Sequence, residues 1–113
     1  MRAFLLVLFL FVTTLYQVRG MDTERLDSLK FRLEMASHEA DRVQAMIDIS
    51  KEYGRHDLSM GLRYAEKSLE TARATKNEAL IADALMNMGF ICFQFGLLEL
   101  ATQHYYEYIG LKR

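Results

Sequence analysis

The sequence predicts an all-α fold of antiparallel helix-turn-helix repeats, an α-solenoid of about two repeats with one N-terminal flanking helix. Three observations support this fold class. Apolar residues after position 22 recur three and four positions apart, which is the spacing of one face of an α-helix. The breaks between these runs are short, so neighbouring helices should fold back antiparallel. Two helix pairs also match each other at a period of about 40 residues, which is typical of repeat proteins.

The amino-terminal segment 1–20 has the layout of a secretory signal peptide. Arg2 precedes an apolar run that ends at Val12, and Val18 and Gly20 supply small residues before a cleavage site after Gly20. The run is shorter than a membrane span, which needs about 20 apolar residues. We therefore expect export, to the periplasm or the medium. An uncleaved segment that anchors the protein in a membrane is the alternative.

Without that segment the chain has 12 Lys and Arg (14 minus Arg2 and Arg19) against 15 Asp and Glu, a formal charge of −3. This balance argues against a nucleic-acid-binding protein, which needs a basic face. The remaining length fits one small domain. Its single cysteine, Cys92, has no partner for an internal disulfide, so packing must stabilise the fold.

Residues 21–38 are predicted to form the flanking helix and a connector. Asp22 or Thr23 is the expected N-cap, because both side chains can accept a hydrogen bond from the first turn. One apolar stripe follows, formed by Leu26, Leu29, Leu33 and Ala36. Phe31 and Met35 lie off that stripe, where they either face a groove or touch a neighbouring helix.

The first repeat is predicted over residues 39–76, with Ser37 as the cap of its first helix. The inner face of that helix comprises Val43, Met46, Ile47, Ser50 and Tyr53. Asp57 is the expected cap of the second helix, whose apolar stripe comprises Leu58, Leu62, Ala65, Leu69 and Ala72. Residues 75–77 are expected to form the turn into the next repeat.

The second repeat is predicted over residues 77–113. Its first helix places Ile81, Leu85, Met88, Cys92 and Phe95 on one face, and after Gly96 the second helix does the same with Leu98, Ala101, Tyr105 and Tyr108. The first helices of the two repeats align at one constant offset, which matches Met46, Ile49 and Ser50 with Leu85, Met88 and Gly89. The second helices align at an offset one position longer, which matches Gly61 with Ala101 and Ala65 with Tyr105.

The second repeat resembles the tetratricopeptide repeat (TPR) family. Leu85 stands at the large opening position, Met88-Gly89 at the Leu-Gly pair, and Ala101 with Tyr105 at the later small-x3-aromatic positions. The chain departs from the pattern in having Cys92 at the first aromatic position and no proline. A small residue is required where two helices cross closely, which explains Gly89 and Ala101.

The resemblance implies a non-catalytic module for protein–protein interaction. The long repeat period is similar to that of TPR regions in exported bacterial proteins. This leaves an alternative, that the chain is the N-terminal fragment of an extracytoplasmic sensor region. The parent would be a bacterial signal-transduction protein, either a histidine kinase or a transcription regulator.

The resemblance also implies a concave groove that binds a protein or peptide ligand and is lined by the first helix of each repeat. The family's groove positions fall on Gln44, Ile47, Lys51, Asp83, Met86, Phe90, Phe93 and Gln94. Phe90 and Phe93 either contact the ligand or pack against the flanking helix. The Lys-and-Asn pattern by which some TPR domains clamp a terminal carboxylate is absent.

No pattern in the sequence points to catalysis, a cofactor or a metal. The three histidines lack metal-ligand spacing. The sequence has no glycine-rich phosphate loop, HExxH motif or GxSxG elbow.

The last helix has a side that no other predicted helix covers, which carries Leu97, Leu100, Tyr106 and Ile109. Monomers rarely expose such an apolar group, so either more sequence follows in the natural protein or two chains meet through this end. We expect residues 21–113, made alone, to self-associate.

Overall fold

The computed structural model describes residues 2–8 and 22–112. Residues 2–8 are helical, and the helices that follow are α2 (Thr23–Met35), α3 (Glu39–Gly54), α4 (Leu58–Thr75), α5 (Glu78–Gln94) and α6 (Leu98–Lys112). No β-strand occurs in this part of the chain. The expected all-α repeat fold is therefore confirmed.

Most of the predicted signal peptide, including Val18 and Gly20, lies outside the described residues. Within the described ranges, no helix combines the length and the apolar character that crossing a membrane requires.

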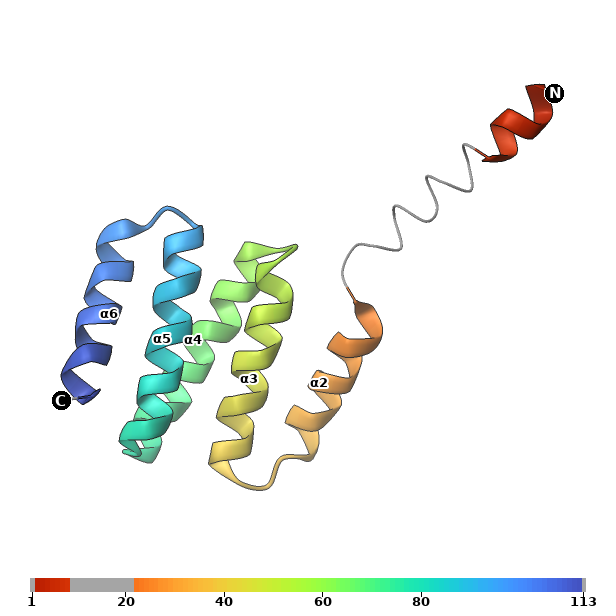
Figure 1. Cartoon of the computed structure of the whole chain (residues 1–113). Helices are drawn as coiled ribbons and strands as arrows, with labels where there is room; N and C mark the ends of the chain where they lie inside the picture. The colour runs from red at the N-terminus through yellow and green to blue at the C-terminus, as the bar shows by residue number, and fades with distance from the viewer. Residues whose placement is uncertain (1, 9–21, 113) are drawn as a thin grey trace.

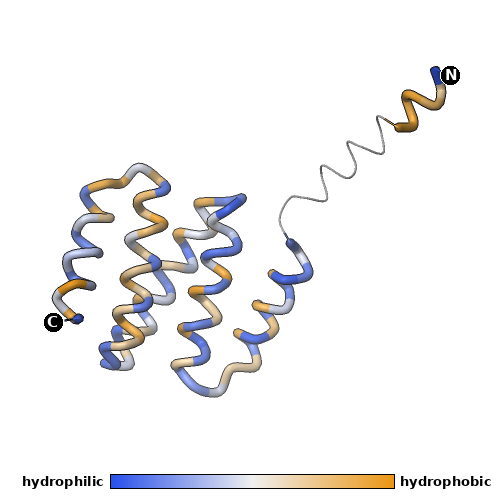
Figure 2. Tube along the Cα trace, viewed as in Figure 1, coloured by the Kyte–Doolittle hydropathy of each residue, from blue (hydrophilic) through white to orange (hydrophobic). Residues whose placement is uncertain are grey.

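The helices α3 to α6 form two antiparallel pairs that stack side by side (Figure 1). Helix α3 pairs with α4 and α5 pairs with α6, while α4 and α3 both contact α5 and so join the two pairs. Helix α2 packs against α3 at the N-terminal end of this stack. Helix α5 is the most apolar of these five helices, as Figure 2 shows by its many hydrophobic positions.

Two of the expected helix caps are present. The side chain of Asp22 accepts a hydrogen bond from the backbone N–H of Arg25 at 3.0 Å, and that of Asp57 accepts one from Met60 at 3.2 Å. Each bond satisfies a donor that the first turn of a helix leaves unpaired. Both predictions are confirmed.

The expected cap of α3 is wrong. His38, and not Ser37, occupies the N-cap position, and its side chain makes no capping hydrogen bond. The backbone of His38 is extended, so Ser37 lies one residue too early to reach the first turn.

The N-terminus of α5, at the turn between the repeats, has a side-chain cap that α3 lacks. Lys76 adopts a left-handed backbone (φ 58°), and the Asn77 side chain accepts hydrogen bonds from two N–H groups of α5.

One apolar cluster joins the four helices α3 to α6. Its buried members are Val43, Ile47, Ala65, Leu69, Ala72, Ala84, Leu85, Met88, Ile91, Cys92 and Ala101. These include nine of the nineteen stripe residues predicted for the two repeats, and four more pack against the cluster partly buried: Leu62, Ile81, Tyr105 and Tyr108. Burial of such a continuous surface between neighbouring units is what stabilises a repeat array.

The stripe predictions fail at the turn between α5 and α6. Phe95 is 37% exposed and Leu98 is 59% exposed. Helix α5 ends at Gln94, and Phe95 is its C-cap at the very end of the helix. Gly96 then adopts a left-handed conformation (φ 78°), which re-aims the chain and leaves Leu98 on an outer side of α6.

In each repeat, a glycine lies where the two helices approach each other most closely. A Cβ on Gly61 would lie 2.9 Å from the Cα of Gly54, on the backbone of α3. A Cβ on Gly89 would lie 2.8 Å from the Tyr105 ring. The small residues that the sequence repeat places at these positions are therefore required by close packing of the paired helices.

Helix α2 is held by a smaller, mixed contact. Leu26 and Leu29 are buried in a second cluster with Ile49 and Tyr53 of α3. An ion pair adds to it, with Arg25 Nε 3.2 Å from a carboxylate oxygen of Glu52. Glu52 is buried, so this partner compensates a charge that would otherwise be costly to desolvate.

The core assignment predicts unequal costs for two truncations on α5. Leu85 is fully buried, whereas Phe90 is 50% exposed. Leu85→Ala should lower the free energy of unfolding by about 2–5 kcal/mol, and Phe90→Ala should lower it much less. Urea denaturation followed by circular dichroism measures both. Equal large losses would show that Phe90 belongs to the core.

The glycine contacts make a second stability prediction. Gly61→Ala should destabilise the fold by about 1–3 kcal/mol, because the backbones of α3 and α4 must move apart. Gly110→Ala is the matched control, since a Cβ on Gly110 meets nothing within 4 Å. That change should stabilise α6 by up to about 1 kcal/mol through helix propensity. Thermal melts of the two variants should shift in opposite directions.

Candidate functional site

A cavity of about 260 Å³ lies between α3 and α5. It is lined by Gln44, Ile47, Lys51, Asp83, Met86 and Asn87. Five of the eight predicted groove residues therefore meet at one place. Ile47 is buried and lies at its floor, whereas Gln44, Lys51 and Asp83 are exposed at its rim.

The remaining predicted groove residues continue along α5. Phe90 and Phe93 are 50% and 58% exposed, and Gln94 is exposed beside them. They do not line the cavity between α3 and α5. The alternative that Phe90 and Phe93 pack against the flanking helix is wrong, because α2 contacts α3 and its backbone does not approach α5.

The central polar group of the cavity is Asn87, which the sequence analysis missed. It is only 4% exposed. Its side-chain nitrogen donates a hydrogen bond to Ser50 Oγ at 3.0 Å, and Ser50 Oγ donates to the carbonyl oxygen of Gly61 at 2.7 Å. The side-chain oxygen of Asn87 is buried and has no hydrogen-bond partner. A buried acceptor without a donor is costly, and Asn87 Oδ1 is such an acceptor on a residue that lines the cavity.

The orientation of the Asn87 amide follows from this network. Because the Ser50 hydroxyl proton is used on Gly61, Ser50 Oγ has only acceptor capacity left for Asn87. The amide must therefore direct its nitrogen to Ser50 and its oxygen away. The opposite orientation would set two oxygen acceptors against each other.

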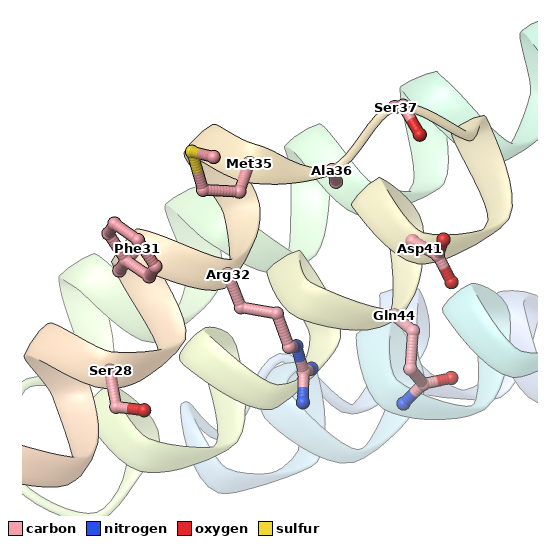
Figure 3. A pocket seen from close by; sticks show the side chains of 8 residues that line it. All are labelled: Ser28, Phe31, Arg32, Met35, Ala36, Ser37, Asp41 and Gln44. Atoms are coloured by element: carbon pink, nitrogen blue, oxygen red, sulfur yellow. The ribbon is translucent and has the colours of Figure 1, made fainter.

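A larger hollow of about 640 Å³ lies between α2 and α3 (Figure 3). It is lined by Ser28, Phe31, Arg32, Met35, Ala36, Ser37, Asp41 and Gln44. Gln44 lines this hollow and the smaller cavity alike, so the two are neighbours. Phe31 and Met35 are largely exposed and thus border the hollow instead of packing against another helix.

A polar network fixes the boundary between the two hollows. Arg32 of α2 lies 2.5 Å from Asp48 of α3, and Gln44 donates to the other oxygen of the same carboxylate at 3.1 Å. Asp48 therefore holds the Arg32 and Gln44 side chains, and Figure 3 shows both extending to the same side of the two helices. The groove is mixed in character, with apolar edges and a polar centre.

Two side chains with shifted pKa values, Cys92 and His104, do not line this groove. Cys92 is fully buried, and burial raises the pKa of its thiol, so the nucleophilic thiolate is disfavoured. Burial lowers the pKa of His104, which lies on α6. In the parts of the chain that the structure describes, no three His, Cys, Asp or Glu residues form a group that could hold a metal ion.

The sequence analysis did not identify Asn87, because its burial and its hydrogen bond depend on another helix. In the sequence it is one polar residue beside an apolar stripe, which normally indicates a solvated surface. Only the contact with Ser50, 37 residues away, shows that it is buried. A polar residue next to the Met88-Gly89 pair was the one available signal.

Comparison with known proteins gives one result. The family model described as the SusR N-terminal TPR domain matches residues 19–104, which is more than half of the chain and includes α2. No curated protein and no solved structure matches the chain. The match agrees with the paired helices, their glycine crossings and the groove along α3 and α5. This chain belongs to the tetratricopeptide repeat family, as a member of its SusR N-terminal TPR domain group.

Proposed function

We propose that the protein is a non-catalytic interaction module that binds an extended segment of a partner protein in the groove along α2, α3 and α5. TPR domains are protein-interaction modules as a rule. The observation that carries the proposal is the buried, unpartnered Oδ1 of Asn87 in the wall of the cavity. Because this oxygen is buried in the free protein, the Asn87 side chain must turn toward the cavity before a main-chain N–H of a bound segment can donate to it.

The surroundings of Asn87 define the chemistry of the partner. Lys51 and Asp83 stand at the rim with opposite charges, so a main-chain amide, which carries both a donor and an acceptor, suits the site better than a formal charge. Exposed apolar side chains flank it on two sides. These are Phe31 and Met35 on α2, and Met86, Phe90 and Phe93 on α5. An extended segment presents alternate side chains, and apolar ones would contact these surfaces.

The groove can be tested with a peptide selected on the purified protein from a random phage-displayed library. We expect Asn87→Ala to weaken binding of that peptide about tenfold, the effect of losing about 1–1.5 kcal/mol from a buried hydrogen bond. Phe93→Ala should weaken it as well, because its exposed ring offers contact area. Leu100→Ala is the matched control, an exposed apolar residue on α6. Isothermal titration calorimetry gives each Kd, and thermal melts verify that each variant is folded.

Ester substitution in the peptide tests the hydrogen bond itself. Replacing one backbone amide at a time by an ester removes single N–H donors. One such ester should weaken binding to the wild-type protein and have little further effect on the Asn87→Ala variant. The proposal is wrong if no peptide is enriched, or if the groove variants and the Leu100→Ala control bind alike.

A second candidate function is sensing, in which this chain forms the N-terminal part of an extracytoplasmic sensor region. The description of the matched family as an N-terminal domain favours it. The groove would then bind a partner or ligand segment on behalf of a histidine kinase or transcription regulator. A reading frame beyond Arg113 that encodes further repeats, a membrane span and such an output domain distinguishes this function from a free adaptor.

Export through residues 1–20 is part of the proposal. Arg2 and the apolar run that follows it are the features that support a signal peptide. The expected product begins at Met21. Intact-mass measurement of the protein from the periplasm or medium decides this point. A product that begins at Met1 and sediments with the membranes would instead support the uncleaved anchor.

A further inference from the structure

The methionines of the described structure divide sharply by exposure. Five of them lie in the part of the chain that the structure describes. Met46 and Met88 are each 7% exposed, and Met60 is partly buried against the apolar cluster that joins α2 to α3. Met35 and Met86 are 68% and 46% exposed. These two thioethers are therefore the ones that solvent and dissolved reagents reach most easily.

Both exposed methionines lie at the groove. Met35 of α2 lines the hollow between α2 and α3, and Met86 of α5 lines the cavity between α3 and α5. The two hollows are neighbours because Gln44 lines both. The exposed thioethers thus flank one groove from two different helices.

Each of these methionines is one helical turn from an exposed phenylalanine. Met35 follows Phe31 by four positions, and Phe90 follows Met86 by four. Side chains at this spacing are neighbours on a helix surface, as Figure 3 shows for Phe31 and Met35. Phe31 and Phe90 are 63% and 50% exposed. Each flank of the groove therefore carries a Met–Phe pair as its apolar surface.

A thioether differs from the other apolar groups of the groove in its reactivity. Its sulfur lone pair attacks one oxygen of a hydroperoxide, so that an S–O bond forms while the O–O bond breaks. With hydrogen peroxide, the departing hydroxide takes the proton of the transferred oxygen and leaves as water. The sulfur is oxidised to a sulfoxide and the peroxide is reduced. The product is a polar side chain in place of an apolar one.

We propose that Met35 and Met86 are sites of reversible oxidation by peroxides, and that their conversion to sulfoxides releases the partner segment from the groove. This regulation rests on the proposed function, because it changes the affinity of the same groove. Apolar side chains of the bound segment would desolvate each sulfoxide oxygen without offering it a donor, which is unfavourable. Both flanks lose half of their apolar pair. Reductases specific for methionine sulfoxide restore the thioether.

The fold itself is protected from the same reaction. Met46 and Met88 are buried, and the folded chain shields their sulfur atoms from a dissolved peroxide. Oxidation at the groove therefore changes the binding surface and leaves the apolar core intact. This separation of exposed and buried methionines is what allows the modification to act on affinity alone.

Peptide mapping by mass spectrometry tests the sites, on protein isolated after expression of the full-length gene and treated with hydrogen peroxide. Met35 and Met86 should gain an oxygen atom before Met46 and Met88 do. Circular dichroism and the thermal melt should stay unchanged at that stage. Oxidation of Met46 or Met88 at the same rate as the groove methionines would overturn the site assignment.

Calorimetric titration with the phage-selected peptide tests the regulation, after catalase has removed the peroxide. Oxidation of both groove methionines should raise the Kd about tenfold, and treatment with methionine sulfoxide reductases should restore it. The double variant Met35→Leu, Met86→Leu keeps apolar side chains of similar volume. It should bind like the wild type and be insensitive to peroxide. Met60→Leu is the matched control and should remain sensitive.

The outcomes separate this inference from the function on which it rests. An unchanged Kd after complete oxidation of Met35 and Met86 would overturn the regulation and leave the binding groove standing. Loss of binding by the oxidised double leucine variant would overturn it as well, because the effect would then come from another residue. Failure of the unoxidised wild type to bind any selected peptide would contradict the proposed function and the regulation together.

Discussion

Ser50 connects three helices through one buried hydroxyl. Its Oγ donates to the Gly61 carbonyl oxygen of α4 and accepts from the Asn87 side chain of α5. The first bond needs the close approach of α3 to α4, which the absence of a side chain at Gly61 permits. The second joins the two repeats at the wall of the groove. A buried hydroxyl is tolerated only when it is hydrogen-bonded, so the packing of the pairs and the shape of the groove depend on the same residue.

The helices of the fold contribute unequally to its core. The apolar cluster on α3 to α6 contains most of the buried apolar side chains. Helix α2 adds a smaller cluster and the Arg25–Glu52 ion pair. Its outer residues Phe31 and Met35 stay exposed and extend the groove beyond the repeats. A helix that precedes the repeats therefore enlarges the groove. The family match, which begins before α2, treats it as part of the same domain.

The two uncovered apolar surfaces are of different kinds. The groove has a polar centre, where Asn87, Gln44 and Lys51 surround a cavity, and it suits a main chain with side chains on either edge. The second surface is the side of α6 with the exposed side chains of Leu98, Tyr106 and Ile109, where the Thr102 hydroxyl donates to the Leu98 carbonyl oxygen of its own helix. Specific recognition requires correctly placed polar groups. The groove has such groups and this side of α6 does not, which is why we assign the partner segment to the groove.

The sequence by itself determined the helices, their pairing and most of the core, because a helix needs one apolar side and the repeat places that side twice. Through the resemblance to the TPR family, whose groove positions fall on the first helix of each repeat, it also indicated five residues that meet at the cavity. Only the tertiary structure decided the role of Asn87, since its burial depends on Ser50 across the boundary between repeats. Only the tertiary structure decided the exposure of Leu98 too, because Leu98 has the spacing of a core residue. A left-handed turn at Gly96 sets the direction in which α6 starts, and local periodicity does not encode that direction.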